Sequence, residues 1–213
     1  MSSATVTRIS NDWLGALPET WSRLPFQVVF SERKESSTQT DAHLTPSQKF
    51  GVMPQSDYME LTGNRVVLNL TGSDNMRHVE PGDFISHLRS FQGGLEFSAL
   101  MGKVSAAYTV IAPQQEMESG YFRHLFKSAA FIQALQSTTD QLRDGQSIRF
   151  GELKLVELPY PPICVQRAIA DLLDRETAEI DEFVAESEKL ITLLNERRAA
   201  VITQAVTKGL DPT

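Results

Sequence analysis

The sequence predicts an α+β fold in which a mainly β domain with a few helices is followed by one long C-terminal coiled-coil helix. Three observations support this prediction. Short strand-like runs between glycine and proline turns fill most of the chain, prolines cluster at residues 159–162, and apolar residues then recur about every 3.5 positions. Because the residue before a proline is held extended, we expect a domain over residues 1–158 and a helical dimerisation and spacer region over residues 159–213.

The first domain is expected to contain hairpins and two helices. The strand-like runs cover residues 65–70, 84–88 and 104–111, with turns at residues 81–83 and 93–94. A helix is predicted over residues 119–136 and a shorter one near residues 150–153. The longer helix can bury one face, which comprises Tyr121, Leu125, Phe126, Phe131 and Leu135.

The C-terminal region is predicted to be one uninterrupted helix. Residues 163–208 contain no proline or glycine, so the helix would run about 70 Å at about 1.5 Å per residue and end at Gly209. Its apolar seam comprises Ile169, Leu173, Ile180, Val184, Ile191, Leu194, Val201 and Ala205. A small domain cannot cover such a seam, so the helix needs a partner helix. Glu176, Ser187 and Arg198 interrupt this seam with polar side chains, which indicates that the helix pairs specifically with a particular partner helix.

Composition limits the class of protein. The chain has 213 residues, of which 41% are hydrophobic, enough for one sizeable core. The longest apolar runs fall far short of the roughly 20 residues of a membrane span, and no signal pattern opens the chain, so we expect a soluble cytoplasmic protein. Cys164 is the one cysteine and the four histidines are scattered, so we expect neither a disulfide nor a bound metal or cofactor.

The net charge of −7 argues against a DNA-binding module, which usually carries a basic face. Residues 1–158 have 14 Lys+Arg against 17 Asp+Glu, a net −3, and residues 159–213 have 6 against 10, a net −4. A DNA-binding face would therefore need local clustering of basic residues, or a partner subunit that supplies most of the positive charge.

The common catalytic motifs are missing from the sequence. It contains no glycine-rich phosphate loop, no GxSxG elbow and no HExxH helix. A metal nuclease using Asp83, Glu152 and Lys154 is a weak alternative, because Asp83 already belongs to a turn. Cys164 has no histidine partner in the sequence around it and is interpreted as an inert thiol.

A polar segment offers groups that suit nucleic acid. Arg89, Ser90 and Gln92 would sit at a glycine-rich hairpin tip, where they could bond base edges or phosphates, although an ordinary solvated hairpin has the same composition. Weaker candidates for DNA contacts are Lys49, Gln146, Ser147 and Arg149. Trp13 and Trp21, on either side of Pro18, are interpreted as packing anchors.

Several separated stretches occur in the order found in one known family, the specificity subunits of type I restriction-modification systems. The stretches are WLGALPETW at residues 13–21, PGDFI to QGG at residues 81–94, VSAAYTV at residues 104–110, PP to DRET at residues 161–177 and AVTKGL at residues 205–210. The sequence therefore resembles one half of such a subunit. It departs from the family at Ile163-Cys164-Val165, where acidic residues usually stand.

The resemblance implies a DNA-reading subunit that is not itself an enzyme. In this family two recognition domains are joined by antiparallel helices that act as a ruler between two half-sites on double-stranded DNA. Methylation subunits carry the cofactor and the chemistry, and a restriction subunit translocates DNA. Because this chain holds one set of motifs, it is either a half-subunit that pairs with itself or a piece of a longer chain. A coiled-coil interaction protein without DNA readout is the main alternative.

Overall fold

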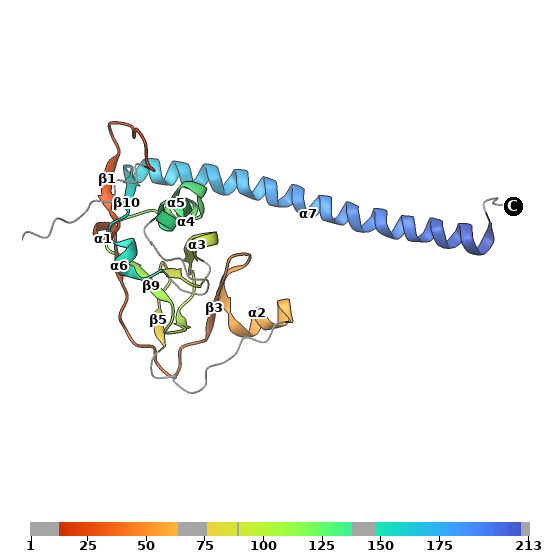
Figure 1. Cartoon of the computed structure of the whole chain (residues 1–213), viewed down its shortest axis with the longest axis horizontal. Coiled ribbons are helices and arrows are strands. Elements are labelled where there is room, and N and C mark those ends of the chain that lie inside the picture. The colour runs from red at the N-terminus through yellow and green to blue at the C-terminus, as the bar shows by residue number, and fades with distance from the viewer. Residues whose placement is uncertain (1–12, 64–75, 89, 138–147, 210–213) are drawn as a thin grey trace, which may run out of the picture. The chain divides into compact units, whose positions relative to one another are not determined.

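The computed structural model describes residues 13–63, 76–88, 90–137 and 148–209, and the chain divides into two compact units, Met1–Ala170 and Asp171–Thr213. The first unit contains strands, short helices and the first turns of the long helix, and the rest of that helix makes up the second unit (Figure 1). The predicted α+β class is therefore confirmed. The strand-like run at residues 65–70 lies outside the described residues.

A four-stranded antiparallel sheet forms the centre of the first unit. Its strands are ordered β2 (Phe30–Glu32), β9 (Thr109–Pro113), β6 (Phe84–Ser86) and β7 (Glu96–Phe97). Successive side chains of a strand point to opposite faces. Phe84 and Ile111 accordingly enter one hydrophobic core, whereas Ile85 and Val110 enter another. Both faces of the sheet are thus buried.

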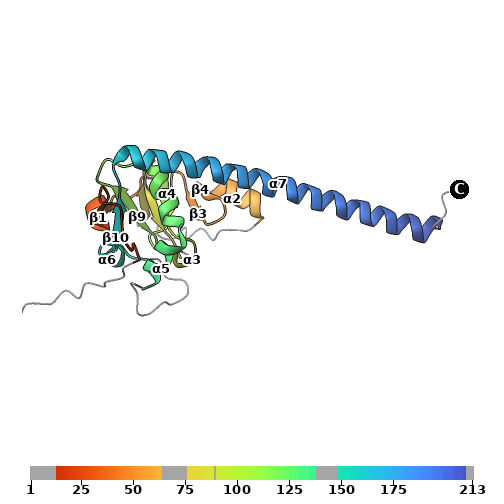
Figure 2. The same ribbon diagram turned by 90° about the horizontal axis from the view of Figure 1, so that it is seen from above.

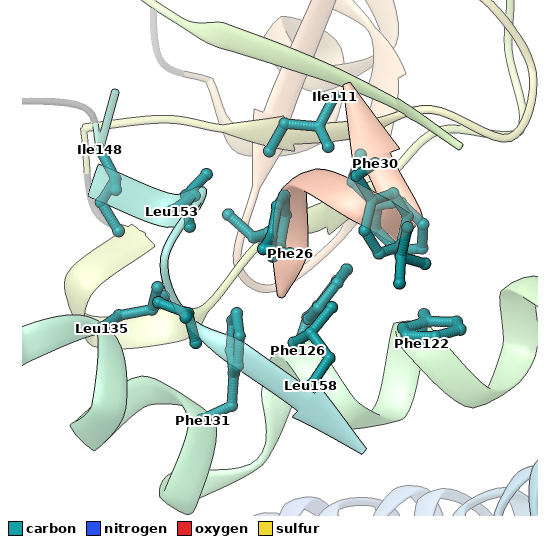
Figure 3. Packing of buried hydrophobic residues seen from close by; sticks show 14 of the residues in the cluster. Phe26, Phe30, Ile111, Phe122, Phe126, Phe131, Leu135, Ile148, Leu153 and Leu158 are labelled. Atoms are coloured by element: carbon teal, nitrogen blue, oxygen red, sulfur yellow. The ribbon is translucent and has the colours of Figure 1, made fainter. Parts of the chain in front are cut away.

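Phenylalanine rings dominate the larger core, which lies between the sheet and four short helices (Figure 3). The helices are α1 (Phe26–Val29), α4 (Ser119–Lys127), α5 (Ala129–Ser137) and α6 (Phe150–Leu153). The Phe126 ring lies 4.9 Å from that of Phe84 and 4.7 Å from that of Phe131. Rings at these separations add attraction beyond the burial of apolar surface.

The prediction of one helix over residues 119–136 was wrong, because the chain bends between α4 and α5. Ser128 adopts an extended conformation there, and its hydroxyl accepts a hydrogen bond of 3.2 Å from the amide of Phe131. A serine that caps the following turn favours a helix boundary over helix continuation. The short helix predicted near residues 150–153 is confirmed as α6.

The smaller core lies on the other face of the sheet. It is covered by the hairpin of β3 (Leu44–Ser47) and β4 (Gly51–Pro54) and by the pair β5 (Arg77–Val79) and β8 (Gly102–Val104). The single strand predicted over residues 104–111 is two strands, because the Tyr108 amide donates to the Ser105 carbonyl and closes a turn between β8 and β9. Helix α2 (Gln55–Thr62) follows β4 directly.

The two ends of the first unit pair with each other. Strand β1 (Ser22–Pro25) runs antiparallel to β10 (Glu157–Tyr160). The indole N–H of Trp13 donates to the Glu157 carbonyl at 3.2 Å, and its ring lies edge-on to Phe131. The interpretation of Trp13 as a packing anchor is confirmed.

The long helix has the predicted ends. Helix α7 spans Ile163–Lys208, and Gly209 leaves it with a φ of +84°, a conformation that favours glycine. No helix among the described residues is both long and apolar enough to cross a membrane.

The first turns of α7 belong to the first compact unit, which extends to Ala170, later than the predicted boundary at residues 158 and 159. Gln166 is fully buried there. Its side-chain carbonyl accepts from the Glu118 amide at 2.9 Å, and its amide group donates to the Pro161 carbonyl at 2.8 Å. Gln166 thereby joins the start of α7 to the start of α4.

Replacing Gln166→Met should lower the free energy of unfolding by about 2 kcal/mol, since two buried backbone groups lose their partners while the volume is kept. For a chain of this size the melting temperature should fall by roughly 4–8 °C. The control is Arg167→Met at the neighbouring exposed position, which should change the melting temperature little. Equal melting temperatures for the two variants would contradict this role for Gln166.

Candidate nucleic-acid interface

The segment that the sequence suggested as a hairpin tip is a short helix, α3 (Ser90–Gly93), in the connection between β6 and β7. The Ser90 amide donates to the His87 carbonyl at 3.0 Å, and the Ser90 hydroxyl accepts from the His87 amide at 2.8 Å. Ser90 is buried, whereas Gln92 is exposed on the same helix. Arg89 lies outside the described residues.

Helix α3 is fixed against the larger core. Gly94 has a φ of +74°, and a Cβ at this position would overlap the carbonyl oxygen of Phe126, so only glycine allows this close approach. Beside it, the ammonium group of Lys127 forms an ion pair with Glu96, a carboxylate only 2% exposed. These contacts set the position from which Gln92 faces solvent.

The tip of the β3–β4 hairpin lies next to α3. A Cβ on Gly93 would overlap the side chain of Gln48, so these two residues are in close contact. Lys49 follows Gln48 at the tip and is exposed. The fold therefore brings the segments of Lys49 and Gln92, two of the candidate DNA contacts, to the same part of the surface.

An exposed aromatic residue, Phe50, completes this hairpin tip, and sequence reasoning missed it. Its side chain is 36% exposed, the ammonium nitrogen of Lys49 lies 5.2 Å from the centre of its ring, and the Tyr58 ring of α2 lies 6.4 Å away. The sequence signal that could have pointed to Phe50 was its place in the turn-rich stretch between the residues of β3 and β4. A lysine above an aromatic ring places positive charge beside an apolar surface.

A second set of bonds holds the base of the hairpin. Lys103 of β8 donates its ammonium hydrogens to the carbonyls of Thr38 and Gln39 at 3.2 and 3.3 Å, and its amide donates to the Ala42 carbonyl at 2.8 Å. Burial, together with the charge of Lys103, lowers the pKa of His43. Lys103 is almost fully buried, so this lysine positions the hairpin and does not supply charge to the surface.

His78 links the same segment to β5. Its Nε2 lies 2.8 Å from Glu80 and its Nδ1 lies 2.9 Å from Asp41. The bond to Glu80, opposed by burial and reinforced by Asp41, raises the pKa of His78. Burial favours the neutral form of Asp41, but hydrogen bonds from Thr38 and from His78 prevail and lower the pKa of Asp41 to about 2.

The remaining candidates do not join this surface in the described part of the chain. Arg149 is exposed just before α6, where its amide donates to Glu152 at 3.0 Å, and α6 is separate from β3 in both views (Figures 1 and 2). Gln146 and Ser147 lie outside the described residues.

Two residues of the nuclease alternative, Asp83 and Glu152, have structural partners. The Asp83 carboxylate accepts two hydrogen bonds from the Arg33 guanidinium, at 2.7 and 3.0 Å, and one from the Glu80 amide at 2.8 Å. The bond to Asp83 raises the pKa of Arg33. Among the described residues, no group of three or more His, Cys, Asp or Glu side chains could hold a metal ion.

The architecture defines a class of protein: two cores around one sheet, closed by pairing of the unit's ends, with a single long helix leaving the last strand. Solved proteins of type I restriction-modification systems share this fold. The resemblance to a type I specificity subunit predicted from the sequence is confirmed.

Three relatives illustrate the likeness. A chain from a study of complex assembly and conformational transition of the type I R-M system has a TM-score of 0.64 and 16% identity, covering 92% of this chain and 48% of that one. The HsdS subunit from Thermoanaerobacter tengcongensis has a TM-score of 0.56 and 15% identity, covering 92% and 47%. The type I restriction enzyme EcoKI specificity subunit of Escherichia coli K12 is 29% identical over 97 residues, which are 46% of this chain and 21% of that protein.

The chain thus spans about half the length of the solved relatives. No protein-family model matches it.

Stability should depend on the protonation of His78. A raised pKa in the folded state stabilises the fold fully below the unfolded value of 6.5, and this contribution is lost as pH rises through the folded pKa. Chemical denaturation between about pH 6 and pH 9 should therefore show the difference between the wild type and His78→Gln shrinking as pH rises. His124→Gln is the control. If the stability difference between the wild type and His78→Gln stayed the same from about pH 6 to pH 9, that result would argue against a charged His78.

Replacing Asp83 should lower the stability of the fold. Asp83→Ala removes the acceptor of the Nε and Nη2 groups of the mostly buried Arg33, which in the described part of the chain keeps only its bond to the exposed Glu35. The change should lower the free energy of unfolding by about 3 kcal/mol, measured by denaturant titration. Asp57→Ala removes an exposed carboxylate and is the matched control. If Asp83 instead served a metal, the wild type but not Asp83→Ala would be stabilised by added Mg²⁺ or Mn²⁺.

Proposed function

We propose that this chain is one half of a type I specificity subunit, which reads a DNA sequence with residues 1–158 and pairs through residues 159–213. The observation that supports this proposal most is the likeness of fold, which extends over 92% of the chain and about half of each solved relative. The chain itself catalyses no reaction in this proposal. A methylation subunit and a restriction subunit bring the chemistry to the target that the chain selects.

The surface formed by the β3–β4 tip and α3 is the proposed contact with double-stranded DNA. Gln92 carries an amide that can bond both N6 and N7 of adenine in the major groove, and Lys49 carries a charge suited to phosphate. Phe50 offers an apolar group of the kind that contacts a thymine methyl. With a net charge of −7, the chain depends on its partner subunits for most of the positive charge along the DNA.

Self-pairing of α7 would place two identical recognition domains in one assembly. A two-fold related pair reads two inverted copies of one half-site. The target is then an interrupted palindrome, and a coiled-coil protein without DNA readout would have no such target.

Mapping of methylated bases in DNA from cells that express this chain with its methylation subunit tests the proposal. We expect an interrupted palindromic motif that appears only when the chain is present. Co-purification of the two proteins without any motif would contradict sequence readout by a self-paired chain, and failure of the proteins to associate would contradict the family role. Cleavage by the chain alone with Mg²⁺ would favour the nuclease alternative.

Single variants distinguish the two proposed kinds of contact. Gln92→Ala should relax the motif at one position in each half-site, since a bidentate base contact contributes about 1–3 kcal/mol of discrimination. Lys49→Ala should weaken binding of the assembled complex to all sequences alike and reduce the salt dependence of log Kd by about one unit per half-site. Lys154→Ala, an exposed lysine beside α6, is the control and should change neither.

A further inference from the structure

Gln92 is carried by a connection that backbone pairing fixes at few points. Strand β7, which follows α3, is two residues long. It lies at the edge of the sheet, and in the described part of the chain it pairs with β6 alone. A side chain that reads a base must be held to within about 0.5 Å of its position. Contacts other than backbone pairing therefore have to hold α3.

A buried carboxylate beside α3 provides such contacts. The side chain of Glu96 is 2% exposed, and its Oε1 atom forms an ion pair with the ammonium group of Lys127, the last residue of α4. The Nε2 atom of His87, which directly follows β6 and is also buried, lies 3.5 Å from the same Oε1 atom. These three side chains, the Glu96 clamp, join the chain before α3, the chain after α3 and the end of α4.

Helix α3 is tied directly to the His87 side of the clamp. The Ser90 hydroxyl accepts a hydrogen bond of 2.8 Å from the His87 amide, and the Ser90 carbonyl accepts one of 2.8 Å from the Gly94 amide. The ring of His87 lies edge-on to that of Tyr108, with ring centres 6.4 Å apart. A displacement of His87 would therefore carry α3 with it.

Stability alone does not account for a buried ion pair at this place. The cost of removing both charges from water often equals or exceeds their attraction, so apolar residues of similar volume are often as stable. An ion pair that forms hydrogen bonds is directional, and this one is satisfied in one arrangement of β7 and α4. The pair is thus better suited to fixing the position of α3 than to stabilising the domain.

We propose that Glu96 is a positioning residue for DNA readout, which holds α3 between Lys127 and His87 so that the amide of Gln92 meets the edge of one base. Glu96 is buried and acts through Gln92, without touching DNA. This inference deepens the proposed contact with DNA and rests on that proposed function. When the clamp is lost, the two hydrophobic cores keep the domain folded. The Gln92 amide then takes several positions, and the two hydrogen bonds of a bidentate contact do not form together.

Hydrogen exchange of the full chain without DNA tests the clamp itself. The variant with both Glu96→Gln and Lys127→Met removes the two charges and nearly keeps the side-chain volumes, so its melting temperature should stay close to that of the wild type. The α3 amides should exchange roughly tenfold faster than in the wild type, and the β9 amides at the same rate. A large fall in the melting temperature would assign the pair to stability and overturn the inference. Unchanged exchange in α3 would overturn it as well, because the clamp would then not hold that helix.

Methylation mapping in cells that express the chain with its methylation subunit tests the positioning role. At the base that Gln92→Ala identifies, discrimination should fall roughly tenfold in the Glu96→Gln and Lys127→Met variant, within the range of a bidentate contact. The rest of the motif should stay sharp. Adding Gln92→Ala to this variant should relax the motif no further, because a contact that is already lost cannot be lost twice, whereas a purely structural role would make the two effects add.

Gln166→Met is the control for the motif, because it lowers stability at the start of α7 and should leave every position of the motif sharp. A motif as sharp as that of the wild type in the Glu96→Gln and Lys127→Met variant would overturn the inference. Relaxation at every position, or at a position that Gln92→Ala leaves sharp, would do the same. A wild type without any motif would contradict the proposed function, whereas the exchange of α3 reports on the clamp separately, so the two failures are distinguishable.

Discussion

Burial of phenylalanine against one face of the central sheet is the constraint on which the rest of this molecule depends. Phe84 of β6 packs against Phe30 of β2 and against Phe126 of α4, so one cluster holds segments from the start, middle and later part of the domain. The surface elements take their positions from it. Gly94 rests on the Phe126 carbonyl, which seats α3, and α3 in turn contacts the hairpin tip through Gly93 and Gln48.

Much of the domain's charge is used internally. Arg33 is held by Asp83, Lys127 by Glu96, and Lys103 by the carbonyls before β3. Each of these cations lies in or beside the interior, where a partnered charge is tolerated and an unpartnered one is costly. Among the described residues these three cations therefore add little charge to the surface near the hairpin tip, which is consistent with the proposal that a partner subunit supplies most of the positive charge along the DNA.

The sequence predicted some elements and sites better than others for identifiable reasons. The single helix expected over residues 119–136 fails at Ser128, because apolar periodicity continues across a residue whose hydroxyl caps the next turn. The hairpin tip expected around Ser90 is a helical turn, since its glycines meet the backbone of α4 and the side chain of Gln48. The sequence offered Lys49 and Gln92 as two unrelated candidates for DNA contacts, and only the fold shows that their segments are neighbours.

The sequence by itself determined α7, both its length and its apolar seam, because helix continuity depends on local features: 46 residues without proline or glycine, a repeat near 3.5, and Gly209 at the end. The order of motifs likewise sufficed for the resemblance to specificity subunits. Tertiary structure alone decided which polar groups face solvent. Arg33 and Asp83 stand 50 positions apart, and Gln166 reaches Glu118 across 48, so their pairing follows from how strands and helices pack and leaves no periodic trace along the chain.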